Sequence, residues 1–356
     1  MWHTLVIMGL IVVCMTGCKK NSTHSPSIIS ELGYQPSLSV DTTGIIRVVY
    51  GKGDSILLST SQDSGKTFSE EILIDTLHGL HLGMSRGPQI SSSANYTVVV
   101  AMNKPGDIHA YSLEHSKNMW TKRVKVNDVP RIAKEGLSSV ASDQLDNFYV
   151  TWLDLRQDNR NKIYASRSAQ GGEHWQENVL VYRSPDSTVC ECCRPAIAVN
   201  GDKVFIMFRN WLNGSRDMHV AESGDQAVHF NQPVKLGDGT WKLKGCPMDG
   251  GGITVYKNGE VMTTWRREDT VFINVVNQSE QKLGSGKQSD ITSYGNNYGV
   301  TWVDENQIYF SSSKQPMASV LGNGSFPAIV ALNNMEYLIA WESESKIMSL
   351  VVPGIK

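Results

Sequence analysis

The sequence predicts an all-β protein, a β-propeller with seven blades. Short segments of alternating apolar and polar residues recur along the 356 residues, and β-branched residues are frequent in them. No stretch shows the 3.6-residue period of an amphipathic helix. Seven copies of one unit, spaced about 37–57 residues apart, favour one four-stranded sheet per copy. The alternatives are a tandem of β-sandwiches, which would not repeat in this register, and a six-bladed propeller whose first and last copies merge into one blade.

Each copy begins with a short apolar strand and continues, after a turn, with a second strand that in most copies ends near an aromatic residue. The first strands begin at Pro36, Pro88, Ser138, Pro195, Gly252, Asp290 and Pro327. The second strands include four of the nine tryptophans at equivalent ends, namely Trp152, Trp265, Trp302 and Trp341. Because the same position is used repeatedly, we expect these indole rings to pack between blades rather than to form a binding stack.

The composition narrows the class of protein. Hydrophobic residues make up 40% and charged residues 19%, which is enough apolar material for a large core and excludes a disordered chain. The formal net charge is −2, whereas a dedicated nucleic-acid binder normally carries a basic excess. We therefore expect no nucleic-acid partner.

The N-terminus has the pattern of an export signal. An apolar run over residues 5–13 is too short to span a bilayer as a helix but fits the core of a signal peptide. It leads to Thr16-Gly17-Cys18, which resembles the lipobox of bacterial lipoproteins and implies cleavage before Cys18 and acylation of its thiol. An ordinary signal peptide with an incidental cysteine is the alternative. The expected organisation is a signal peptide over 1–17, a lipid-anchored polar tether over 18–34 and a propeller over 35–356, located in the bacterial cell envelope, at the outer membrane.

One hairpin motif carries a family resemblance. The segment Ser61-Gln62-Asp63-Ser64-Gly65-Lys66-Thr67-Phe68 resembles the Asp-box repeat of bacterial sialidases and other propellers. Asp63 can accept backbone N–H bonds inside such a turn, Gly65 permits a positive φ, and Phe68 can pack between sheets. A partial copy runs over 223–230 with Ala in place of Gly, and a degraded copy over 168–175 has lost its Asp. The resemblance implies a propeller, usually six-bladed in that family, with its site on the face opposite the Asp-boxes.

The strand order of a propeller blade, from A at the axis to D outside, sorts the loops by face. The B–C loops and the D–A loops between blades share one face, which here holds most of the arginines and all cysteines of the folded domain. Propeller ligands generally bind at the axial mouth. The sialidase resemblance implies three arginines for a substrate carboxylate, a Tyr nucleophile with a Glu partner, and an Asp acid/base. The candidates are Arg86, Arg194, Arg216 and Arg267 for substrate binding, Asp154, Asp217 and Asp249 as acids, and Tyr294 as nucleophile.

This resemblance is incomplete. The Arg-Ile-Pro motif that opens the sialidase fold has no good match, and Arg86-Gly87-Pro88 in the second copy is only a loose analogue. The alternative is that the arginines pair with neighbouring acids, as Arg216 can with Asp217.

The most distinctive segments contain cysteine. Cys190, Cys192 and Cys193 precede the fourth copy and Cys246 precedes the fifth, so all four should meet on one face. Three interpretations remain open: two disulfides that join the loops, a soft-metal site for copper or zinc, or a redox thiol pair. The additional ligands available to a metal on that face are His78, His81, Met84 and Met248.

Three functions follow from these patterns. The first is glycan recognition or hydrolysis at the axial mouth by a membrane-anchored lipoprotein. The second is an envelope metal-binding or redox protein that uses the cysteine cluster. The third is a non-catalytic scaffold that presents a surface to another envelope protein.

Overall fold

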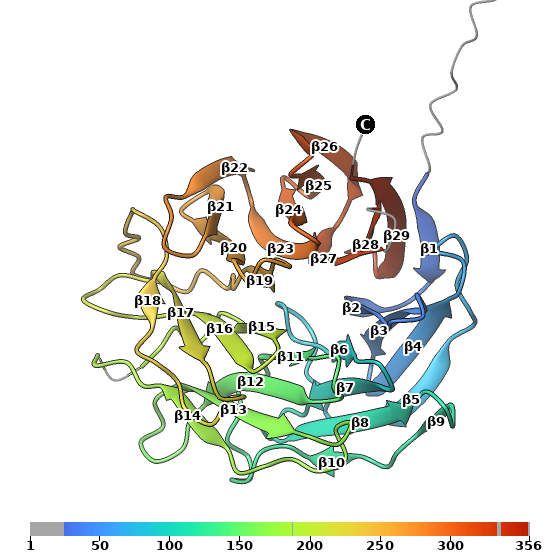
Figure 1. Cartoon of the computed structure of the whole chain (residues 1–356), viewed down its shortest axis with the longest axis horizontal. Helices are drawn as coiled ribbons and strands as arrows, with labels where there is room; N and C mark the ends of the chain where they lie inside the picture. The colour runs from blue at the N-terminus through green and yellow to red at the C-terminus, as the bar shows by residue number, and fades with distance from the viewer. Residues whose placement is uncertain (1–24, 187, 333–335, 355–356) are drawn as a thin grey trace, which may run out of the picture.

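The computed structural model describes residues 25–186, 188–332 and 336–354, which form seven antiparallel sheets around a central axis (Figure 1). The described residues contain strands and no helix, so the predicted all-β class is confirmed. The first strand of each sheet lies at the axis, and these seven inner strands contact one another in a closed ring.

The sheets follow one another around the ring in chain order. The first contains β2 (Tyr34–Val40), β3 (Ile46–Lys52), β4 (Ser55–Ser61) and β5 (Ile72–Thr76); the second contains β6 (Gln89–Ser92), β7 (Tyr96–Met102), β8 (Ile108–Glu114), β9 (Met119–Trp120) and β10 (Val124–Lys125). The third contains β11 (Ser138–Ser142), β12 (Phe148–Asp154), β13 (Lys162–Ser168) and β14 (Val179–Tyr182); the fourth contains β15 (Ala196–Asn200), β16 (Lys203–Arg209), β17 (Met218–Ser223) and β18 (Val234–Lys235).

The remaining sheets complete the circle. The fifth contains β19 (Gly252–Val255), β20 (Val261–Arg267), β21 (Thr270–Val275) and β22 (Gln281–Ser285). The sixth contains β23 (Lys287–Tyr294), β24 (Asn297–Asp304), β25 (Gln307–Ser312) and β26 (Gln315–Asn323). The seventh contains β27 (Ser325–Ala331), β28 (Glu336–Ser343), β29 (Lys346–Pro353) and, from the other end of the chain, β1 (Ser27–Ser30).

The seventh sheet is closed by the N-terminal strand. β1 pairs antiparallel with β29, so that the first and last described segments lie side by side in Figure 1. This pairing supplies the outer strand that the last repeat lacks and covers an otherwise open sheet edge. Seven blades are therefore confirmed over six, because the last repeat completes its own blade instead of merging with the first. Residues 27–30 lie inside the range expected to be a tether, so the propeller begins before residue 35.

The repeated tryptophans pack between sheets, as expected. All four are at most 2% exposed. Trp152 on β12 joins an apolar cluster with Val98 and Val100 of the preceding sheet, and Trp341 on β28 likewise joins Phe310 of its preceding sheet. Large apolar side chains at these positions bury area between sheets that no backbone strand ladder joins, and this burial stabilises the ring.

The hairpin between β4 and β5 has the turn geometry expected for Asp63 and Gly65. The Asp63 carboxylate accepts the backbone N–H groups of Lys66 and Thr67 at 3.1 and 2.9 Å, and the Thr67 hydroxyl at 2.6 Å. These hydrogen bonds lower the pKa of Asp63 to about 2. Gly65 has φ +82°, a conformation that favours glycine.

We expect Gly65→Ala to lower the free energy of unfolding by about 1–3 kcal/mol. The positive φ is strained for alanine, and the new Cβ would lie 3.0 Å from Val351 and 3.1 Å from Leu338. Gly53→Ala is the matched control, since Gly53 has φ +59° and nothing within 4 Å of its Cβ position. Urea denaturation of both variants separates the cost of backbone strain from that of the contacts with Val351 and Leu338. Equal losses in the free energy of unfolding would show that these contacts contribute nothing.

The expected export signal falls outside the described residues. The signal peptide over 1–17 and Cys18 both belong to this part of the chain. Among the residues that the structure describes, no helix is both long and apolar enough to cross a membrane.

Candidate functional site

A polar pocket lies at the axial mouth, on the face where the inner strands begin. The side chains that line it come from the loops leading into six of the seven sheets and from the first residues of their inner strands. The charged, amide and aromatic residues in its lining are Gln35, Gln89, Arg194, Asp249, Gln288, Asp290 and Phe326. This is the face on which the sequence predicts a ligand.

Three of these residues stand at irregular points of the inner strands. Gln35, Gln288 and Phe326 have φ values of +51°, +55° and +52°, and each lies at a register shift in its pairing with the next strand. Such bulges redirect side chains, and non-glycine residues in this conformation concentrate at functional sites. The irregular backbone therefore places two amides and one aromatic ring around the mouth.

Arg194 crosses the axis. It precedes β15 of the fourth sheet, yet its Nη1 donates to Oε1 of Gln89 in the second sheet at 2.7 Å. Burial lowers the pKa of Arg194, while the charge of Asp290 in the sixth sheet opposes this shift. A guanidinium remains protonated in proteins, so Arg194 holds a fixed positive charge between sheets that are not neighbours.

Two carboxyl groups line the same pocket, and burial raises the pKa of both. Asp249 is 3% exposed and accepts the backbone N–H of Gln288 at 3.1 Å, and Gln288 Oε1 accepts the N–H of Phe326 at 2.9 Å. Asp290 accepts backbone N–H groups from Ile291 and Ile329 at 3.0 and 3.2 Å. Desolvation is the largest cause of the raised pKa at both groups. The site therefore combines one fixed cation with two carboxyls that protonate more easily than usual.

A second cavity lies further along the axis. The middle residues of the inner strands line it, including Ile90, Val140 and Ile253, and Arg194 and Asp290 line it as well. Arg194 therefore stands between the open mouth and the interior of the channel.

Of the four predicted arginines, Arg194 is the one that lines the axial pocket. Arg86 donates to the backbone oxygen of Glu135, and Arg267 forms an ion pair with Glu280. Arg216 lies 4.1 Å above the Trp211 ring and pairs with Glu191. The structure does not bring the four together. Arg216 and Arg267 do pair with acids, but with Glu191 and Glu280 rather than with their neighbours in sequence.

The predicted acids and the predicted nucleophile also lie in different places, and Asp249 alone among them lines the pocket. Asp249 lines the pocket, whereas Asp154 is fully buried in an ion pair with Arg156 and accepts Trp152 Nε1 at 2.8 Å. Asp217 accepts the backbone N–H of Trp241 at 2.8 Å. Tyr294 ends β23, whose first residues carry Gln288 and Asp290, so it lies toward the opposite face. Asp154, Asp217 and Tyr294 are absent from the pocket lining.

Sequence reasoning missed Asp290, Phe326 and the three glutamines of the mouth. A usable signal was present, because Gln35 and Phe326 each directly precede a proline near the start of an inner strand, and Gln89 directly follows such a proline. Arg194 has the same position before Pro195. A polar or aromatic residue beside the first proline of a repeat thus marks the mouth.

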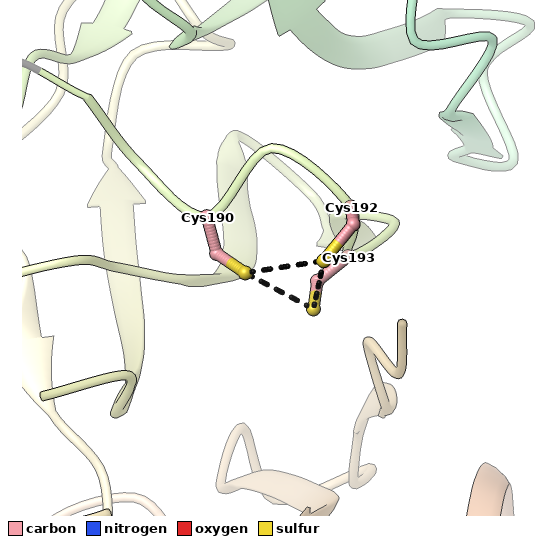
Figure 2. A group of neighbouring side chains, drawn as sticks. All are labelled: Cys190, Cys192 and Cys193. Atoms are coloured by element: carbon pink, nitrogen blue, oxygen red, sulfur yellow. Dashed lines mark hydrogen bonds between the residues drawn. The ribbon is translucent and has the colours of Figure 1, made fainter. Parts of the chain in front are cut away.

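The cysteines meet on the same face. Cys192, in the loop between β14 and β15, forms a disulfide with Cys246, in the loop between β18 and β19. Cys190 and Cys193 are buried thiols, and Figure 2 shows them beside Cys192. One disulfide therefore joins the two loops, where two were considered. The Cys190 sulfur lies 3.4 Å from that of Cys193 and 3.7 Å from that of Cys192.

The cluster fits a metal poorly while the disulfide is formed. Three sulfur atoms lie within 4.8 Å of one another, but Cys192 is bonded to Cys246, so two thiols remain for a soft metal ion. Within the described residues, the histidines considered as ligands do not join this group. His78 pairs with Asp54, His81 packs against Gly136, and Met84 is 48% exposed.

Comparisons with known proteins support the fold. No protein-family profile and no curated protein matches the sequence. Among solved structures, the α-L-arabinofuranosidase Arb93A of Fusarium graminearum, bound to an iminosugar inhibitor, is 11% identical, with a TM-score of 0.55 over 93% of this chain and 98% of that one. Virginiamycin B lyase from Staphylococcus aureus, with quinupristin, is 12% identical, with a TM-score of 0.57 over 92% and 98%.

A sialidase is also among the structural neighbours. NanB from Streptococcus pneumoniae is 11% identical, with a TM-score of 0.46 over 93% of this chain and 70% of that one. At these identities the similarity to the arabinofuranosidase and to the lyase establishes the propeller fold alone. Any activity has to be argued from the residues of the mouth.

Proposed function

We propose that this protein binds a carbohydrate at the axial mouth. The observation that carries the proposal is Arg194, a guanidinium that crosses the axis to donate to Gln89, feels the charge of Asp290, and lies in a pocket lined by further amides and carboxyls. A sugar offers hydroxyl groups that both donate and accept hydrogen bonds. Guanidinium groups donate, carboxylates accept and amides do both, so this set matches a ligand rich in hydroxyls.

The pocket favours a neutral or weakly acidic sugar over a strongly anionic one. Arg194 contributes one fixed positive charge, and Asp249 and Asp290 oppose it unless they are protonated. A bidentate contact of Arg194 with a ring carboxylate or with two adjacent hydroxyls is possible, but the three-arginine arrangement of sialidases would need side chains that are engaged elsewhere. The iminosugar-bound arabinofuranosidase is a propeller neighbour consistent with a sugar ligand.

Glycoside hydrolysis at the same mouth is the second candidate function. Its support is the pair Asp249 and Asp290, because glycosidases typically use two carboxyl groups and keep one of them protonated by raising its pKa. In this proposal Asp249 and Asp290 replace Asp154, Asp217 and Tyr294 as the groups that act on substrate.

Calorimetric titration of the purified protein with a panel of neutral and acidic oligosaccharides tests the proposal, and chromogenic glycosides in parallel test hydrolysis. We expect saturable binding of at least one sugar class, unchanged in Tyr294→Phe, since Tyr294 lies toward the other face. Release of the chromophore would support hydrolysis in addition to binding. No binding across the panel would overturn the carbohydrate proposal and favour a non-catalytic scaffold.

We also propose, from residues 5–18 alone, that the protein is an envelope lipoprotein anchored through Cys18. Mass spectrometry of the mature N-terminal peptide is expected to find an acylated cysteine as the first residue. An unmodified N-terminus elsewhere in the chain would instead indicate an ordinary signal peptide.

A further inference from the structure

The four cysteines form two pairs that differ in access to solvent. Cys246 is exposed and Cys192 is half-buried, whereas Cys190 and Cys193 are 0% and 1% exposed. The surface pair is oxidised and the buried pair is reduced. The Cys190 sulfur lies within 3.4 Å of its buried partner Cys193 and 3.7 Å from Cys192 of the disulfide. Figure 2 shows the three sulfur atoms of one loop facing one another.

The two buried thiols are electrostatically unequal. Arg216 Nη1 donates to the Cys190 sulfur at 2.9 Å, and Cys190 and Cys193 have the C-x-x-C spacing of many redox-active pairs. The hydrogen bond from Cys193, together with Arg216 and Arg209, lowers the pKa of Cys190 to about 7 despite its burial. Burial raises the pKa of Cys193, and its donation to Cys190 adds to this. Cys190 is thus the thiol that deprotonates more easily and the nucleophile of a first exchange step. Cys193 would act in a second step.

We propose that these cysteines are a thiol–disulfide exchange site, in which the buried pair Cys190 and Cys193 exchanges with the surface disulfide Cys192–Cys246. In the first step the Cys190 thiolate attacks the Cys192 sulfur, which forms a Cys190–Cys192 bond and releases the Cys246 thiolate. In the second step Cys193 gives its proton to that thiolate and attacks Cys190, which releases the Cys192 thiolate. One disulfide and two thiols exist before and after, so no outside oxidant is needed.

The exchange would change both the surface and the mouth. It moves the disulfide inward and leaves Cys192 and Cys246 as thiols, of which Cys246 is exposed to small thiols or to cysteines of another protein. The bond that it breaks joins the two loops that carry Arg194 and Asp249, two and three residues beyond Cys192 and Cys246 respectively. The position of the disulfide therefore controls how tightly these two residues of the pocket are held together.

Disulfide mapping of the full-length protein in glutathione buffers tests this proposal. After acid quenching and alkylation of free thiols, mass spectrometry should find both Cys192–Cys246 and Cys190–Cys193 linkages in the wild type at intermediate potentials. Cys193→Ser removes the second step, so it should accumulate the Cys190–Cys192 linkage with Cys246 alkylated. Cys190→Ser is the matched control, in which Cys192–Cys246 should be the single linkage.

Three results would overturn the proposal. The first is a wild type in which Cys192–Cys246 is the sole linkage at every potential, with Cys190 and Cys193 always alkylated. The second is a protein in which all four cysteines remain in disulfides at every glutathione redox potential tested. The third is stoichiometric copper or zinc in protein purified without chelator, with four thiols alkylated once the metal is removed. The wild-type mapping decides among these even if a variant fails to fold.

Discussion

Arg194→Met is expected to abolish carbohydrate binding at the axial mouth. Arg194 donates to Gln89 at 2.7 Å and lies near the charge of Asp290, so its loss removes the fixed cation and leaves Gln89 Oε1 without this donor. Removing one member of a buried, hydrogen-bonded charge set costs about 2–5 kcal/mol, or roughly 30-fold to several thousand-fold in affinity. Titration calorimetry with the sugar bound by the wild type measures this loss.

Arg194→Lys separates charge from geometry. Lysine retains the positive charge but not the planar fork that reaches two partners at once. We expect intermediate affinity if charge and geometry both contribute, and circular dichroism should show an intact β-fold in both variants. Full affinity in Arg194→Met, with the fold retained, would place the ligand away from the mouth.

Ile29→Asp is expected to open the ring at its closing strand. Ile29 on β1 is 9% exposed and belongs to an apolar cluster with residues of the first and seventh sheets, such as Leu38 and Ile347. Removing a buried isoleucine forfeits about 1.5–3 kcal/mol of transfer free energy, and an uncompensated buried carboxylate adds to that cost. We therefore expect a loss of about 3 kcal/mol or more in the free energy of unfolding and a much lower Tm.

Ile28→Asp is the matched control on the same strand. Ile28 is 46% exposed, so an aspartate there remains in water and should change stability little. Thermal unfolding of both variants, followed by circular dichroism, makes the comparison. Equal melting temperatures would mean that β1 does not close the seventh sheet in solution.

The repeated pattern of the sequence was sufficient for the fold. Alternating strands recur in every blade, and the tryptophans at equivalent positions and the turn around Asp63 recur in several of them, so they leave a periodic signal. The same topology assigned the loops to faces, and it placed Arg194, Asp249 and the four cysteines on the face that holds the pocket. These predictions needed the order of strands in a blade and no knowledge of a single side-chain contact.

The remaining site residues depended on backbone details without a periodic signal. Gln35, Gln288 and Phe326 reach the mouth because bulges turn them toward it, and one irregular residue per strand does not alter an alternating pattern. Arg216 and Arg267 are attractive candidates in sequence, yet Arg216 pairs with Glu191 and lies over the Trp211 ring, and Arg267 pairs with Glu280.

The sequence by itself determined the propeller class, the number of repeats and the face on which a site would form, since all three follow from short-range patterns repeated along the chain. Tertiary structure decided which segments far apart in sequence contact one another. It paired β1 with β29, joined Cys192 to Cys246 and carried Arg194 across the axis to Gln89. Each of these contacts joins segments far apart in sequence, and their geometry is set only when all seven sheets close around one axis.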